Sequence, residues 1–70
     1  MITAAEVADA YSVVAEVARD YAAALRAEPL DLERCADLSQ RLGVVSQCAV
    51  TVALSWMSAL LAANGRPVVE

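Results

Sequence analysis

The chain has 70 residues, nine acidic side chains and five arginines, and it contains no histidine, so its formal net charge is −4. This acidic balance argues against nucleic-acid binding, which normally needs a basic face. The missing histidine removes the commonest general base, and no glycine-rich phosphate loop is present. We therefore expect a protein that is not an enzyme and takes neither a cofactor nor a metal.

The first predicted helix begins after Thr3 and runs to about Ala27. Thr3 and Glu6 have the spacing of a capping box, and Ile2 and Val7 have the spacing of a hydrophobic staple. Nothing in the segment breaks a helix before Pro29. Its apolar residues recur in alternating steps of three and four, which predicts one heptad seam along the helix. The predicted seam consists of Ala4, Val7, Tyr11, Val14, Ala18, Tyr21 and Leu25.

A short turn containing Pro29 and Asp31 follows the first helix. Proline disfavours helix at the residue before it, and Asp31 suits a helix cap or an acidic first turn. A turn this short predicts two antiparallel neighbouring helices.

The second predicted helix starts at Leu30 or Leu32 and ends near Ala63, before Asn64, Gly65 and Pro67. Gly43 interrupts its good helix formers, so the sequence leaves open a kink there. The apolar phase is nevertheless kept across Gly43, which favours one continuous helix. The predicted seam consists of Cys35, Leu38, Leu42, Val45, Ala49, Val52, Trp56, Ala59 and Ala63. The fold expected is therefore an all-α antiparallel helical hairpin in one domain at residues 1–65, with a flexible tail at 66–70.

The two cysteines, Cys35 and Cys48, lie on the same predicted helix. Thirteen residues of helix separate them by roughly 20 Å, and a disulfide needs Cα atoms within about 7 Å. The pair cannot close within one chain. We expect two buried, small, apolar side chains in a reducing compartment.

The second helix carries more apolar surface than the first helix can cover. After Gly43 its predicted outer face is apolar, and a helix that is apolar nearly all round must be buried by protein or by lipid. The second helix is also longer, so Trp56 and its apolar neighbours are expected to project past the first helix uncovered. The predicted oligomer or partner interface consists of Val50, Leu54, Trp56, Met57, Leu60 and Leu61. Two hairpins that pair these residues would form a homodimeric four-helix bundle.

These observations predict a cytoplasmic, homo-oligomeric interaction module that binds an unidentified protein partner and regulates or scaffolds it. Glu6 and Asp9 interrupt the first apolar residues, so no signal peptide is expected. The use of arginine without lysine is associated with GC-rich genomes, such as those of actinobacteria or their phages, where an inhibitor or adaptor of this size would fit.

Two alternatives remain open at this stage. Residues 44–63 carry no charge and are long enough to span a bilayer, as in a small holin-like membrane protein. An acidic mimic of DNA is the other alternative, although the predicted acidic face is sparse. No motif in the chain indicates a known family.

Overall fold

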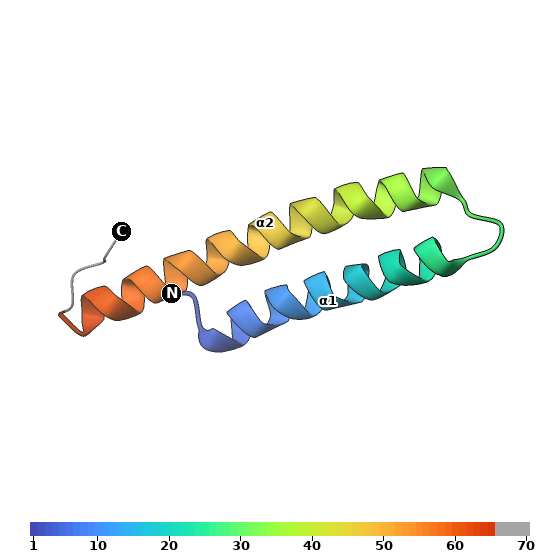
Figure 1. The fold of residues 1–70 in the computed structure, drawn as a ribbon. Helices are drawn as coiled ribbons and strands as arrows, with labels where there is room; N and C mark the ends of the chain where they lie inside the picture. The colour runs from blue at the N-terminus through green and yellow to red at the C-terminus, as the bar shows by residue number, and fades with distance from the viewer. Residues whose placement is uncertain (66–70) are drawn as a thin grey trace.

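The computed structural model describes residues 1–65, so the tail expected at residues 66–70 lies outside the described residues. Two α-helices, α1 (Ala4–Arg26) and α2 (Leu32–Ala63), run antiparallel and are joined by a short loop at residues 27–31 (Figure 1). The predicted antiparallel helical hairpin is therefore confirmed. The pairing of two hairpins into a four-helix bundle stays a prediction.

Helix α1 begins at the predicted cap. The Thr3 hydroxyl accepts a hydrogen bond from the backbone N–H of Glu6 at 3.2 Å, which satisfies one of the unpaired amides of the first turn. Glu6 also places a negative charge in that first turn, where the helix dipole favours it. The helix ends at Arg26, one residue before the predicted end, and the backbone of Ala27 is already extended.

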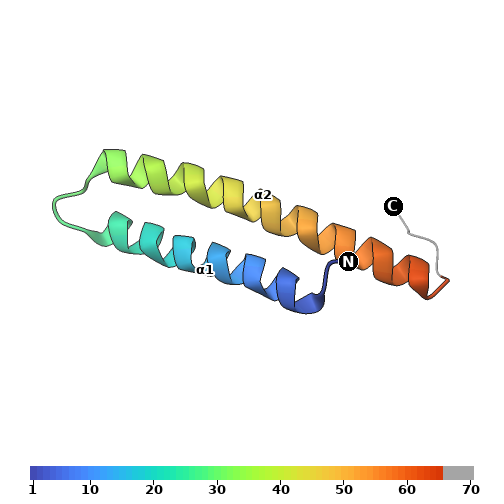
Figure 2. The same cartoon turned by 180° about the vertical axis from the view of Figure 1, so that it is seen from behind.

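Helix α2 begins at Leu32, the later of its two predicted starts. The Asp31 carboxylate accepts a hydrogen bond from the backbone N–H of Arg34 at 3.1 Å, so Asp31 is the cap. The helix passes through Gly43 without interruption, and Figure 2 shows one unbroken ribbon. It ends at Ala63, and Gly65 then adopts a positive φ of 71°, a conformation that glycine reaches at little cost.

The core between the helices is thin and made mostly of small side chains. The buried side chains among residues 1–65 are Val17, Ala24, Cys35, Leu38 and Ala49. Ala24, Cys35 and Leu38 form one cluster near the loop, and Tyr21 packs against it. Because such side chains bury little apolar area, the stabilisation available within one hairpin is small.

The predicted seam of α1 is only partly correct. Val7, Val14, Ala18 and Tyr21 are partly buried as expected, but Ala4 is exposed, and Tyr11 and Leu25 are 44% and 52% exposed. Val17 and Ala24, which were not predicted, are buried instead. The face of α1 that packs on α2 is therefore rotated from the predicted one. After Val7, Val14 and Tyr21, the more buried residue lies three positions later rather than four positions later.

The predicted seam of α2 is confirmed up to Trp56. Cys35, Leu38 and Ala49 are buried, and the seam residues between and after them are partly exposed as far as Trp56. Ala59 and Ala63 are exposed because α2 extends beyond the start of α1 (Figure 1). At about 1.5 Å per residue, α2 is roughly 48 Å long and α1 roughly 35 Å.

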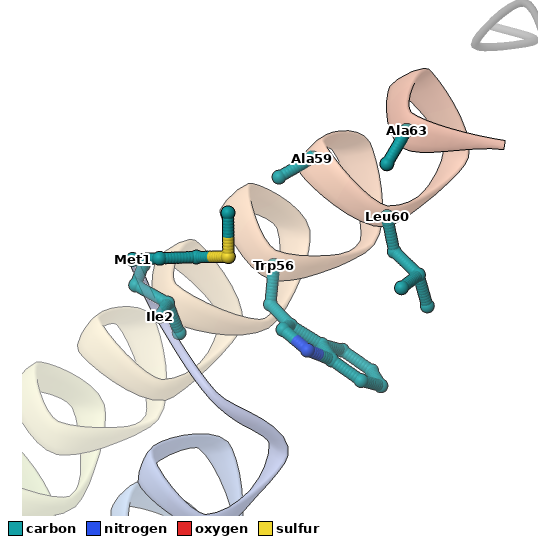
Figure 3. A pocket seen from close by; sticks show the side chains of 6 residues that line it. All are labelled: Met1, Ile2, Trp56, Ala59, Leu60 and Ala63. Carbon is teal, nitrogen blue, oxygen red and sulfur yellow. The ribbon is translucent and has the colours of Figure 1, made fainter. Parts of the chain in front are cut away.

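Trp56 is less exposed than predicted. Met1 and Ile2, the residues before α1, line a shallow apolar pocket with Trp56, Leu60 and two alanines of α2. Figure 3 shows the Trp56 and Leu60 side chains projecting to the same side of α2 at this end of the hairpin. Trp56 is only partly exposed, whereas Leu60 remains 45% exposed. The N-terminal residues thus cover part of the overhang that was expected to be bare.

Candidate interaction surface on the second helix

The six predicted interface residues fall into two groups rather than one surface. At 3.6 residues per turn, Val50, Leu54, Met57 and Leu61 lie roughly 80–140° around α2 from Ala49, the residue at the centre of the seam. Trp56 and Leu60 lie on the seam side, within about 20° of Ala49. They belong to the overhang pocket with Met1 and Ile2.

We call the first group the α2 apolar stripe, consisting of Val50, Leu54, Met57 and Leu61. Val50, Leu54 and Met57 are 47%, 63% and 44% exposed, and Leu61 is partly exposed. The sequence predicted that the stripe lies opposite the seam, but it lies closer to a right angle from it. In a four-helix bundle each helix contacts two neighbours at about that angle, so a second helix could pack on the stripe while α1 stays in place.

A shallow apolar groove on the hairpin was not predicted. Its lining residues come from both helices and are Ala10, Val13, Val45, Cys48, Ala49 and Val52. Val13 lies outside the predicted α1 seam and is 44% exposed. Because the packing face of α1 is rotated from the predicted one, Val13 lies at the edge of the contact between the helices. A sequence analysis that had chosen the observed face would have predicted Val13 near this groove.

The cysteines occupy different environments. Both thiols are free, Cys35 is buried in the core cluster, and Cys48 is exposed and lines the groove. The prediction of two buried cysteines is therefore wrong for Cys48. A side chain at position 48 points about 100° away from Ala49, on the side of α2 that faces away from the stripe.

Within the described residues, the recorded side-chain hydrogen bonds stay inside one helix or its cap. Within residues 1–65, no group of three histidine, cysteine or acidic side chains could hold a metal ion. The ion pair found in the same part of the chain joins Arg41 and Asp37 at 3.3 Å, one helical turn apart on the α2 surface. A hollow at Glu16, Arg19 and Asp20 is open and lies on α1 alone. The Thr51 hydroxyl donates to the Gln47 carbonyl at 2.9 Å, so it is satisfied within its own helix.

Helix α2 also has the length and composition of a membrane-spanning helix. Its mean hydropathy reaches 1.7 over an 18-residue window, and 6% of that window is buried in the hairpin. The core helix of a soluble protein passes the same test, but such a helix is normally mostly buried by its own fold.

No protein-family model, curated protein or solved structure matches the chain.

Proposed function

We propose that this protein is a non-enzymatic, cytoplasmic helical module that self-associates through the α2 apolar stripe and binds a partner protein, which it regulates or scaffolds. The observation that carries the proposal is the exposure of Val50, Leu54 and Met57 together on one side of α2. Large apolar side chains grouped in this way mark an interaction surface in soluble proteins.

The area of the hairpin supports a second body against it. A folded monomeric protein of 7.3 kDa is expected to expose about 4,200 Å². This chain exposes 5397 Å², which is about 1,200 Å² more. A standard protein interface buries about 800 Å² on each partner. The excess is therefore large enough to supply one side of such an interface.

Replacing Leu54 by aspartate tests the stripe. Leu54 is 63% exposed in a single hairpin, so Leu54→Asp leaves a solvated charge there and spares the α1–α2 contact. In a dimer the carboxylate would be buried without a partner, and we expect the dissociation constant to rise at least about 100-fold. Sedimentation equilibrium at micromolar concentration measures this change.

Glu16→Ala is the matched control, because Glu16 is exposed on α1 and away from the stripe. It should leave both mass and melting unchanged. A wild-type chain that is a folded monomer at micromolar concentration would contradict self-association. A Leu54→Asp variant with wild-type mass would contradict the use of this stripe.

A second candidate function is favoured by the composition of α2. This helix is long and apolar enough to cross a bilayer, and little of it is buried by α1. In that case lipid would cover the stripe, as in a small holin-like membrane protein. Expression without detergent separates the candidates: the interaction module stays in the supernatant, whereas a membrane protein sediments with the membranes and floats with phospholipid vesicles.

The partner protein is tested separately. Tagged wild-type chain and the Glu16→Ala variant should capture the same protein from the native host. Capture that persists in Leu54→Asp would place the partner on another surface of the hairpin.

A further inference from the structure

We propose that two copies of this chain pair their α2 helices antiparallel about a two-fold axis at Val50, so that Gly43 of each copy receives Met57 of the other. This inference rests on the proposed self-association. It adds the direction and register of the contact.

The side of α2 that carries the apolar stripe is uncharged along the whole helix. In the second half it holds the stripe itself. In the first half, the same side continues through Gly43, Ser39 and Ala36, all exposed. The ion-paired Asp37 and Arg41 lie roughly 140–180° away from the centre of this side. The charges of the first half therefore leave one continuous path for a partner helix.

Side-chain size changes along this path. Between Ala36 and Gly43 the path presents alanine, serine and glycine, and from Val50 to Leu61 it presents valine, leucine and methionine. Leu32 lies on the same side and is 72% exposed, but it is in the first turn of α2, before the residues that a copy centred on Val50 would contact with its own α2. A helix that is narrow at one end and broad at the other packs evenly against a copy of itself only when the copy runs in the opposite direction. A parallel copy would place large residues against large ones and leave a gap at the small end.

Gly43 supplies an independent observation. It has no positive φ, it is exposed, and a Cβ atom built there would meet nothing within 4 Å. Glycine in a helix interior costs about 1 kcal/mol relative to alanine. The hairpin alone gives no reason for this cost. The close approach of a second backbone or a large side chain does.

The register follows from the residue numbers. When Val50 lies at the two-fold axis, a residue a given number of positions after Val50 faces the residue the same number of positions before Val50 in the other copy. Met57 then faces Gly43. The same register forms two further large-to-small pairs, Leu54 with Ser46 and Leu61 with Ser39. Antiparallel helix dipoles also attract one another, whereas parallel dipoles repel. The occupant of the stripe is thus a second copy of this chain, and the excess surface of about 1,200 Å² is sufficient for it.

Engineered cysteines test the direction of pairing. In a full-length chain carrying Cys35→Ala and Cys48→Ala, with folding verified by circular dichroism, Val50→Cys should form a disulfide-linked dimer on mild oxidation. Met57→Cys alone should not, because the two positions would be about 21 Å apart and a disulfide needs about 7 Å. A mixture of the Gly43→Cys and Met57→Cys chains should cross-link to each other.

The outcomes separate the two levels of the proposal. Self-linking of Met57→Cys, as strong as that of Val50→Cys, would overturn the antiparallel direction while leaving self-association intact. A monomer in sedimentation equilibrium for the wild-type chain would overturn self-association itself.

A size exchange tests the Gly43 contact without cysteines. Gly43→Met should raise the dimer dissociation constant at least about tenfold, because two methionines would then compete for one space. Adding Met57→Ala to the same chain should recover most of the loss. Gln40→Met, one turn away and off the path, is the matched control and should leave the constant unchanged. Equal effects of Gly43→Met and Gln40→Met would overturn the contact.

Discussion

Short polar side chains begin both helices of the hairpin. Thr3 and Asp31 each accept a hydrogen bond from the backbone amide three residues later, at 3.2 and 3.1 Å. Neither residue contributes to the core. Their role is to satisfy amides that no carbonyl of the helix can reach, so each fixes where its helix begins.

The threonine cap can be tested against a second threonine in the same chain. Thr3→Ala should lower the free energy of unfolding by about 1 kcal/mol, because an amide of the first turn loses its acceptor. Thr51→Ala removes a hydroxyl that bonds back to the Gln47 carbonyl inside α2, and it should be neutral or slightly stabilising. Urea denaturation followed by circular dichroism at one protein concentration measures both. Equal losses for the two variants would contradict the capping role of Thr3.

The core residues are small, and this limits what one hairpin can do. Ala49 is completely buried at 0% exposure, and Ala24 and Cys35 are nearly so. Small side chains let the helices approach closely. They also remove little apolar surface from water, so the stabilisation from hydrophobic burial stays low. Leu38 is the large apolar residue in this core, whereas other large apolar residues, Leu54 and Met57 among them, lie outside it.

At the scale of the helices, the face that α1 turns toward α2 determines that Val17 is buried and Val13 is exposed. Val17 is 9% exposed and faces α2, whereas Val13, one turn earlier, is 44% exposed at the edge of the groove. Both are central in the same helix, so the change to alanine alters helix propensity equally at the two sites. Any difference between the variants reports burial.

We expect Val17→Ala to cost about 1–2 kcal/mol more than Val13→Ala, because two buried carbons and their packing contacts are lost. Urea midpoints at a fixed protein concentration provide the comparison. A larger loss for Val13→Ala would contradict this packing of α1, because it would place Val13 rather than Val17 against α2.

The sequence determines the phase of α2 but leaves that of α1 open. In α2 the alternative to Leu38, Val45 and Val52 is Ser39, Ser46 and Ala53, which are more polar or smaller, so the pattern allows one seam. The α1 alternatives are both apolar: Tyr11, Ala18 and Leu25, or Ala10, Val17 and Ala24. Periodicity cannot separate them, and the thin helix contact favours the set that contains the smaller residues.

The candidate surface was likewise only partly predictable. The exposure of Val50, Leu54 and Met57 follows from the excess of apolar residues after Gly43. Their position near a right angle to the seam, and the cover that Met1 and Ile2 give to Trp56, depend on how the two helices meet. The number of apolar residues in α2 predicts neither the position of the stripe nor the cover over Trp56.

For the whole molecule, shape and stability lead to the same expectation. The hairpin measures 55 × 23 × 15 Å, and its radius of gyration is 16.2 Å. A compact domain of this length is expected to have a radius of about 11 Å. An elongated pair of helices with a thin core has little to hold it together alone, and proteins of this kind often fold only as they associate.

If folding and association are coupled, the melting temperature must depend on protein concentration. A tenfold rise in concentration adds about 1.4 kcal/mol to the stability of the dimer relative to unfolded chains. For a dimer of two 70-residue chains that corresponds to a rise of about 3–6 °C in the midpoint. Circular dichroism melts between 2 and 200 µM (roughly the range such association spans) measure it. The Leu54→Asp variant should lose this dependence and melt at a lower temperature. A wild-type midpoint independent of concentration would mean that one hairpin is stable by itself, and the α2 apolar stripe would then need a different occupant.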